Sequence, residues 1–305
     1  MRFVGLLALL WALWASPALA TYSIAAVDPF SGEVGGAGAS CVGTTSIYQI
    51  YVGVPGRGVI QAQALLGASY RFSDAAALLD ARVDPGEILR RLTEPDYDPS
   101  YDRRQYGAVD LSGRSAGYTG PSTIDFADDL QGMREGYVYS IQGNILTGPE
   151  VLTAMEDEFE GCDLAARLMA SLEAGGRDGI GDRRCTPRGI PADGAFIQVD
   201  RATDPAWLSI RFEDTAPEDP VALVREAFDR WRMRNPCPVP IDAGPPDAGA
   251  FDAALPEVGV PDVGVEITDA GEADASTGGS GGCATSGGAS WIPALLLLLG
   301  RRRSP

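Results

Sequence analysis

Hydrophobic and polar positions follow one another in short runs in the first part of the chain, a pattern typical of β-strands. Such runs, bounded by glycine, proline and aspartate, predict strands over 21–27, 33–41, 48–54 and 59–64. The segment 28–32 joins the first two strands, since Pro29 presets φ and Gly32 allows positive φ. We therefore expect the folded region to begin with β structure.

Apolar positions then recur at helical spacing. They predict helices over 74–80, 85–92, 150–159, 164–174 and 220–231, and further strands over 105–110, 114–118, 136–141, 195–199 and 208–212. The helix starts are marked by Ser73, Asp84 before Pro85, a Thr147-to-Glu150 capping box, Asp163, and Asp219 before Pro220. This order of elements predicts an α+β layered sandwich in one domain over residues 21–236.

The first twenty residues have the three parts of a secretory signal. Arg2 is the positive region, residues 3–14 are apolar, and Ala18-x-Ala20 is a small-residue cleavage box. Removal of residues 1–20 by a signal peptidase would make Thr21 the first residue of an exported protein.

The composition changes after Pro236. Residues 237–282 are rich in proline, glycine, alanine and acidic residues, and predict a flexible acidic linker. Residues 283–305 contain Cys283, an apolar run over 291–299 and three arginines at 301–303. The apolar run is about half the ~20 residues that span a bilayer. We interpret the segment as a C-terminal sorting signal, cut by a sorting protease and leaving Cys283 lipidated at the outer membrane or cell surface; a merely apolar end is the alternative.

Charge and composition exclude several classes of function. The formal net charge of −18 argues against binding to nucleic acid or to anionic lipid. The chain contains neither histidine nor lysine, which removes Ser-His-Asp and Cys-His relays, Schiff bases and histidine-ligated zinc. We expect no metal and no cofactor.

Thr21 is the strongest catalytic candidate under these constraints. An N-terminal threonine combines a hydroxyl with an α-amine whose pKa is typically about 7.7–8.0, so that one residue supplies both nucleophile and base. The alternative is that a signal peptide has to end somewhere and that threonine is common.

The five cysteines are Cys41, Cys162, Cys185, Cys237 and Cys283. The first four lie in or beside the domain, and export permits disulfides. No pair has C-x-x-C spacing, so redox and zinc sites are disfavoured. From their positions around one helix we expect a Cys162–Cys185 disulfide, which leaves Cys41 and Cys237 as the second pair.

Several motifs resemble those of the domain-of-unknown-function 1028 family, which is assigned to the N-terminal-nucleophile (Ntn) hydrolase superfamily. The matching segments lie at 21–25, 105–110, 118–120, 142–151, 172–175 and 181–184. Two positions depart from the family pattern: Cys41 stands where arginine is frequent, and Cys185-Thr186 where a glycine and a Gln-Ser pair are usual. The tail resembles a myxobacterial C-terminal sorting signal.

The resemblance implies a four-layer αββα sandwich and hydrolysis of an amide bond by the terminal threonine. It also suggests site residues. Asn144 would stabilise an oxyanion or simply make a turn, and Asp182 with Arg183 would orient a carboxylate or the α-amine, or form an exposed ion pair. The remaining candidates, Ser40, Gln63, Thr119, Gly120, Gln142 and Gly143, rest on the assumed fold.

Two hypotheses of function follow. The first is an exported, surface-tethered amidohydrolase that acts on a small-molecule or peptide amide through Thr21, with Asn144 and Ser40 in its catalytic group. The second is a non-catalytic surface lipoprotein that keeps the sandwich as a binding module. The substrate and the oligomeric state do not follow from the sequence.

Overall fold

The computed structural model describes residues 20–65 and 70–238. Most of the predicted signal peptide and linker, and the whole predicted sorting signal with Cys283, lie outside these residues. Over the ranges described, no helix combines the length and apolar character that crossing a membrane requires.

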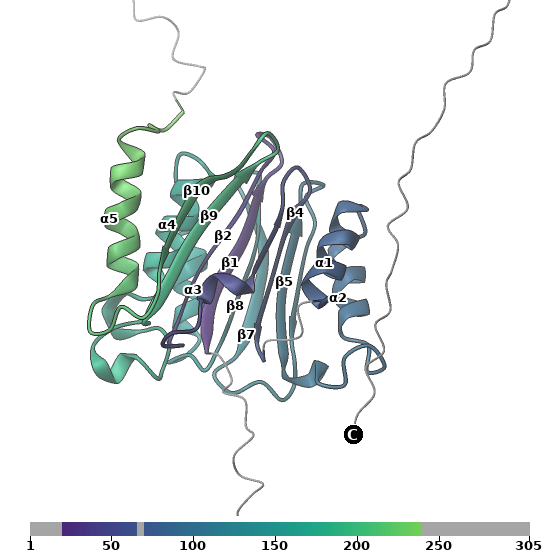
Figure 1. Ribbon diagram of the computed structural model, residues 1–305, viewed down its shortest axis with the longest axis horizontal. Coiled ribbons are helices and arrows are strands. Elements are labelled where there is room, and N and C mark those ends of the chain that lie inside the picture. The colour runs from purple at the N-terminus through teal and green to yellow at the C-terminus, as the bar shows by residue number, and fades with distance from the viewer. Residues whose placement is uncertain (1–19, 66–69, 239–305) are drawn as a thin grey trace, which may run out of the picture. The chain divides into compact units, whose positions relative to one another are not determined.

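Two antiparallel β-sheets form the centre of the domain (Figure 1). The larger sheet has the strand order β10-β9-β2-β1-β8-β7, and the smaller one has the order β3-β4-β5-β6. The strands of the larger sheet are β1 (Thr21–Asp28), β2 (Glu33–Ser40), β7 (Asp128–Arg134), β8 (Tyr137–Asn144), β9 (Gly194–Arg201) and β10 (Asp204–Phe212). Those of the smaller sheet are β3 (Tyr51–Val54), β4 (Gly58–Ala64), β5 (Arg104–Asp110) and β6 (Ser115–Thr119).

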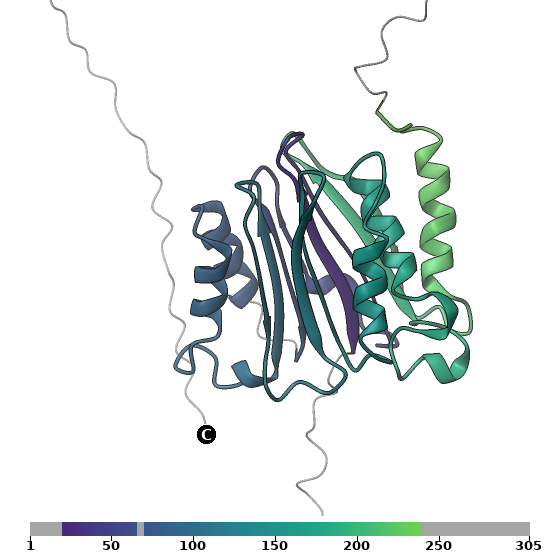
Figure 2. The ribbon, with the colours of Figure 1, turned by 180° about the vertical axis from the view of Figure 1, so that it is seen from behind.

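The helices lie on the outer faces of the two sheets (Figures 1 and 2). Helices α3 (Glu150–Asp157), α4 (Leu164–Ala174) and α5 (Pro220–Arg232) cover the six-stranded sheet, whereas α1 (Tyr70–Asp80) and α2 (Pro85–Leu92) cover the four-stranded one. The mixed helix and strand content predicted from the sequence is thereby confirmed.

The alternation of side chains along β1 shows how the layers are filled. Tyr22, Ile24 and Ala26 belong to the core under α3, α4 and α5. Ala25 and Val27 belong to a separate core between the two sheets. Thr21 shares the phase of Ala25 and Val27, so its side chain is directed toward the space between the sheets.

Strand β2 is rich in glycine because it is packed closely on both faces. A Cβ atom on Gly35 would lie 2.9 Å from Leu168 Cδ1 of α4, and one on Gly36 would lie 2.6 Å from Gln61 Nε2 of the opposite sheet. Neither position has space for a side chain. Close packing therefore accounts for the small residues of this segment.

Two helix-start predictions were wrong, and one strand was missed. Ser73 lies inside α1, which begins at Tyr70, and no side chain caps α3, because Pro149 is its N-cap residue. The caps at Asp84, Asp163 and Asp219 are confirmed by hydrogen bonds to backbone N–H groups. Strand β7 was not predicted, since its sequence is mostly polar and it lies at the edge of its sheet.

The expected disulfide pairing was also wrong. The bonds join Cys41 to Cys185 and Cys162 to Cys237. The loop after α4 turns back toward the end of β2, where the Cys41 N–H donates to Asp182. Cys185 therefore lies beside Cys41, although 144 positions separate them in the sequence. That these four cysteines form disulfides is confirmed.

Candidate active site

Thr21 begins β1 in the middle of the six-stranded sheet and is completely buried. Its cross-strand partners are Ser40 on β2 and Asn144 on β8. Residues directly opposite one another in a sheet present their side chains on the same face. The register thus brings together the three residues predicted to be catalytic, and the Thr21 hydroxyl donates to Ser40 Oγ at 3.2 Å.

Ala20, the residue before Thr21, is also held in place by burial and by hydrogen bonds. Ala20 is fully buried, and its carbonyl oxygen accepts hydrogen bonds from the Ser40 hydroxyl and from Arg184 Nη2, the latter at 3.2 Å. Two donors from different parts of the chain therefore converge on one carbonyl oxygen, at the bond where cleavage is expected.

Asp182 holds Arg184 in this position. The buried carboxylate accepts from Arg184 Nε at 3.2 Å and from Nη2 at 2.9 Å, and it also accepts from the backbone N–H groups of Arg184 and Cys41. A guanidinium that is held through two of its nitrogens has little rotational freedom. Arg183, the arginine that we selected from the sequence, instead donates to the backbone oxygen of Asp125 and is largely exposed.

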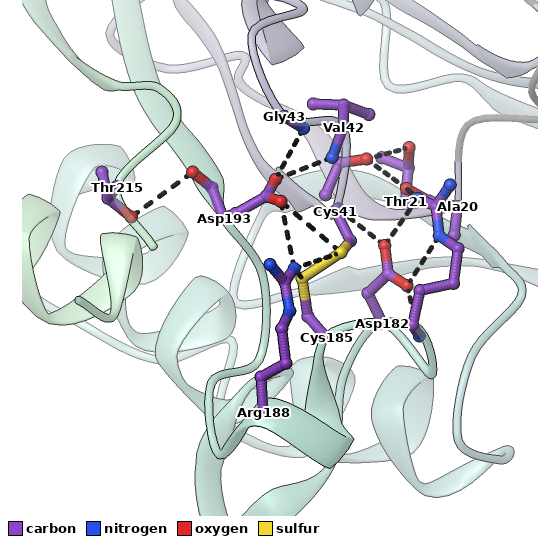
Figure 3. The surroundings of a disulfide bond; sticks show 12 residues. Ala20, Thr21, Cys41, Val42, Gly43, Asp182, Cys185, Arg188, Asp193 and Thr215 are labelled. Carbon is purple, nitrogen blue, oxygen red and sulfur yellow. Dashed lines mark hydrogen bonds and ion pairs between the residues drawn. A yellow bond between two sulfur atoms is a disulfide. The ribbon is translucent and has the colours of Figure 1, made fainter. Parts of the chain in front are cut away.

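Figure 3 shows the Cys41–Cys185 disulfide beside Asp182. Asp193 Oδ1 accepts from the backbone N–H groups of Val42 and Gly43, at 2.7 and 3.1 Å, and its Oδ2 pairs with Arg188 at 3.1 Å. Asp193 and the two sulfurs lie close enough together to suggest a metal site. However, sulfurs joined in a disulfide offer no thiolate ligand.

A network of side-chain amides supports Thr21 from the opposite sheet. Gln63 on β4 donates to the Thr21 carbonyl oxygen at 3.4 Å and to Gln105 Oε1 at 2.8 Å, while it accepts from Ser23 at 2.6 Å. Gln63 is buried, as are Ser23 and Gln105. Gln63 therefore positions the backbone of Thr21.

The same network fixes the orientation of Asn144. Gln105 Nε2 donates to the carbonyl oxygens of Asp128 and Gly143, at 3.0 and 2.8 Å, so its Oε1 must face the other way. There it accepts from Asn144 Nδ2 at 3.1 Å. One of the two Asn144 amide hydrogens is thus engaged, and its buried Oδ1 has no hydrogen-bond partner among the described residues. Asn144 therefore presents an acceptor oxygen whose orientation is set by the bond from its amide nitrogen to Gln105.

Ile145 follows Asn144 in a left-handed conformation with φ of 53°. This conformation is rare for a β-branched residue. It is held by two backbone hydrogen bonds, one from the Ile145 N–H to Ile124 and one from the Arg183 N–H to Ile145. The turn that was the alternative role for Asn144 is therefore made by Ile145, and Asn144 itself completes β8.

The other four predicted residues make structural contacts. Gln142 donates to Ser23 and Gln61 inside the network, and the Thr119 hydroxyl donates to Asp129. A Cβ on Gly143 would meet Leu146 at 2.5 Å, and one on Gly120 would meet the Asp102 carbonyl oxygen at 2.4 Å. These contacts serve the hydrogen bonding and packing of the two sheets.

Tyr22 is the nearest phenol in the sequence. Burial raises its pKa well above the usual value, and the negative charges of Asp219 and Asp182 raise it further. Its side chain belongs to the core under the helices, on the opposite face of β1 from the Thr21 hydroxyl. Tyr22 therefore stays protonated and does not serve as a base for Thr21.

A family of unknown function, DUF1028, matches residues 21–223. A solved structure, protein SPO2555 from Silicibacter pomeroyi, which carries the same family label, has 23% sequence identity and a TM-score of 0.57, with 70% of this chain and 89% of that chain covered. No curated protein matches. The structural likeness shows the fold alone, and the family match spans nearly the whole folded region; the chain belongs to the DUF1028 family.

Proposed function

We propose that this protein is an exported amidohydrolase with Thr21 as its N-terminal nucleophile, built on the four-layer αββα sandwich of Ntn hydrolases. Two face-to-face antiparallel sheets with helices on both outer faces support the fold assignment. The observation that carries the proposal is the position of Thr21, at the start of a central strand with Ser40 and Asn144 directly opposite.

The proposed reaction begins once the Ala20–Thr21 bond has been cut. The new α-amine takes the proton of the Thr21 hydroxyl, directly or through a water, while Oγ1 forms a bond to the carbonyl carbon of the substrate. Collapse of the tetrahedral intermediate expels the amine, which takes up that proton. Water then hydrolyses the ester on Thr21 and restores the enzyme.

The buried acceptor on Asn144 has a role in this scheme. Cross-strand partners have Cβ atoms about 4.5–5.5 Å apart, so the Thr21 backbone and the Asn144 side chain are neighbours. An unpaired acceptor in a buried site is costly unless a donor arrives. We assign Asn144 Oδ1 to accept a hydrogen of the α-amine, which orients the amine lone pair toward the Thr21 hydroxyl.

Export and anchoring are part of the same proposal. The signal-like residues 1–20 would bring the domain out of the cytoplasm, and lipidation of Cys283 would hold it at the outer membrane or cell surface through the acidic linker. Intact-mass measurement of the membrane fraction tests this part. A C-terminus at Pro305 with an unmodified Cys283 would rule it out.

The catalytic part is tested with p-nitrophenyl acetate, a small activated carbonyl substrate that requires no knowledge of the natural one. The exported protein, shown by intact mass to begin at Thr21, should release p-nitrophenolate at least 100-fold faster than Thr21→Ala. Thr21→Ser should retain part of the rate, and a chain that keeps Ala20 should be inactive, since it lacks the α-amine. Equal rates for wild type and Thr21→Ala would favour the non-catalytic binding module.

A further inference from the structure

The carbonyl oxygen of Ala20 occupies a built site for one oxygen atom. The Ser40 hydroxyl and Arg184 Nη2 both donate to it, and Ser40 Oγ in turn accepts from the Thr21 hydroxyl at 3.2 Å. Ser40 Oγ therefore links the Ala20 carbonyl oxygen to the Thr21 hydroxyl, the proposed nucleophile, through two hydrogen bonds. Two donors that converge on a single oxygen beside a nucleophile have the arrangement of an oxyanion hole.

Neither donor depends on Ala20 for its position. Ser40 ends β2 opposite Thr21, and the adjacent Asp193 N–H donates to the Ser40 carbonyl oxygen. Arg184 is held through two nitrogens by Asp182, whose backbone forms a bridge to Leu146. When the residues before Thr21 are removed, both donors stay in place and the position of the Ala20 oxygen becomes available to a ligand.

We propose that Ser40 and Arg184 form the oxyanion site of the mature enzyme, and that the carbonyl oxygen of the substrate takes the position of the Ala20 oxygen. This inference rests on the proposed function and changes the assignment made from the sequence, which gave this role to Asn144. One Asn144 amide hydrogen is engaged by Gln105, whereas the donors of Ser40 and Arg184 already converge on a carbonyl oxygen.

The step balances as follows. Thr21 Oγ1 forms the new bond to the carbonyl carbon and its proton passes to the α-amine, while the π electron pair of the carbonyl moves onto oxygen. The Ser40 O–H and the Arg184 N–H stabilise this oxyanion, and re-formation of the C=O bond expels the leaving group. An uncut chain blocks its own site, because the Ala20 carbonyl already occupies it.

The test compares Arg184→Ala with Arg177→Ala in the mature full-length protein. Arg177 is a half-exposed arginine of the preceding turn, paired with Glu158 at 3.0 Å, so its removal makes the same change in charge away from Thr21. With p-nitrophenyl acetate, Arg184→Ala should lower kcat by about 10²–10³-fold with little change in KM, the effect of removing one oxyanion donor. Arg177→Ala should stay within about twofold of wild type.

Two further measurements separate an oxyanion role from a structural one. Added guanidinium at millimolar concentration should restore part of the kcat of Arg184→Ala and leave that of Thr21→Ala unchanged. Arg184→Lys keeps a cation beside the buried Asp182, so it should fold like wild type by circular dichroism and still lose at least tenfold in kcat, because a point charge does not reproduce the guanidinium fork.

The outcomes distinguish the two proposals. If wild type is faster than Thr21→Ala but Arg184→Lys and Arg184→Ala match Arg177→Ala, the nucleophile assignment stands and the oxyanion site is wrong. A loss in Arg184→Ala that guanidinium does not restore in a folded protein also overturns it. If Thr21→Ala is as fast as wild type, the proposed function fails, and the oxyanion site fails with it.

Discussion

The two disulfides of the domain each lie beside an aspartate that binds an arginine with both carboxylate oxygens, yet they hold different kinds of structure. Cys41–Cys185 lies next to the Asp182–Arg184 pair, and Cys162–Cys237 lies next to the Asp163–Arg232 pair. The chemistry of the two regions is nearly the same. The comparison therefore shows how the position of such a disulfide and ion pair in the fold determines what they stabilise.

At Cys162–Cys237 the bonds join the ends of two outer helices. Asp163 caps α4 by accepting from the Ala166 N–H, and both of its oxygens lie 2.7 Å from the guanidinium of Arg232, the last residue of α5. The carboxylate and the guanidinium keep 11% and 18% of their side-chain surface exposed. This region attaches a helix to the outside of the sheet.

At Cys41–Cys185 the bonds join the end of a central strand to the loop that carries Arg184. The Asp182 side chain has no exposed surface, and it accepts from the N–H of Cys41 itself. Ser40, which contacts Thr21, is the residue directly before Cys41. A substitution in this region is therefore expected to affect the candidate active site. The same substitution at the other disulfide is expected to affect only the packing of the outer helices.

The largest effect is expected from Cys41→Ala/Cys185→Ala. The closed loop spans 144 positions, which corresponds to about 5 kcal/mol of unfolding free energy in the chain-entropy model. The release of Cys41 should also let Ser40 and Arg184 move apart, so we expect at least a 100-fold loss of p-nitrophenyl acetate hydrolysis. Urea unfolding gives the free energy, and the hydrolysis rate is measured well below the transition. A variant that keeps full activity would show that the disulfide does not position the site.

Cys162→Ala/Cys237→Ala is the matched change in the other region. Its loop of 75 positions corresponds to about 4.5 kcal/mol in the same model, only about 0.6 kcal/mol less than the first. Activity should stay within about twofold of wild type under folding conditions, because this disulfide lies at the ends of the outer helices α4 and α5. Comparable loss of activity in the two double variants, at equal stability, would contradict the distinction between the regions.

The different outcomes of the sequence predictions have a physical reason. Most strands and helices were found because their apolar period is local, and the caps at Asp84, Asp163 and Asp219 were found because capping acts over two or three residues. Strand β7 carries little apolar signal, since it is a half-exposed edge strand. Its formation depends on the neighbouring β8 more than on its own residues.

The site was predictable in its residue types and not in its contacts. Thr21 could be predicted from the cleavage box. The choice between Arg183 and Arg184 depends instead on where the Asp182 carboxylate lies, and the N–H of Cys41, 141 positions away in the sequence, holds that carboxylate. The two departures from the family pattern, Cys41 and Cys185, were noted separately and prove to be the two ends of one disulfide. Such long-range pairings leave no local signal.

Asp182→Ala tests the site region without touching its disulfide. It leaves the Arg184 guanidinium and two backbone N–H groups without their buried acceptor, and removing one partner of a buried pair costs about 3–5 kcal/mol. The hydrolysis rate should fall at least tenfold, because Arg184 is no longer held toward Thr21. Chemical denaturation and the p-nitrophenyl acetate assay are the measurements, and a folded variant with the wild-type rate would show that Arg184 needs no positioning.

The smallest effect on hydrolysis is expected where the same substitution is made in the helix region. Asp163→Ala removes a helix cap and one partner of an ion pair that is buried about as deeply as Asp182–Arg184, so the free energy of unfolding should fall by a similar amount, about 3–5 kcal/mol. Asp163→Asn keeps a capping oxygen and should recover about 1 kcal/mol of this, the share of the cap. Both variants should hydrolyse p-nitrophenyl acetate at the wild-type rate. If Asp163→Ala instead slowed hydrolysis as much as Asp182→Ala, the position of an aspartate–arginine pair in the fold would not determine what the pair controls in this domain. The effect would then have to be transmitted through α4 and β1, which lie between Asp163 and Thr21.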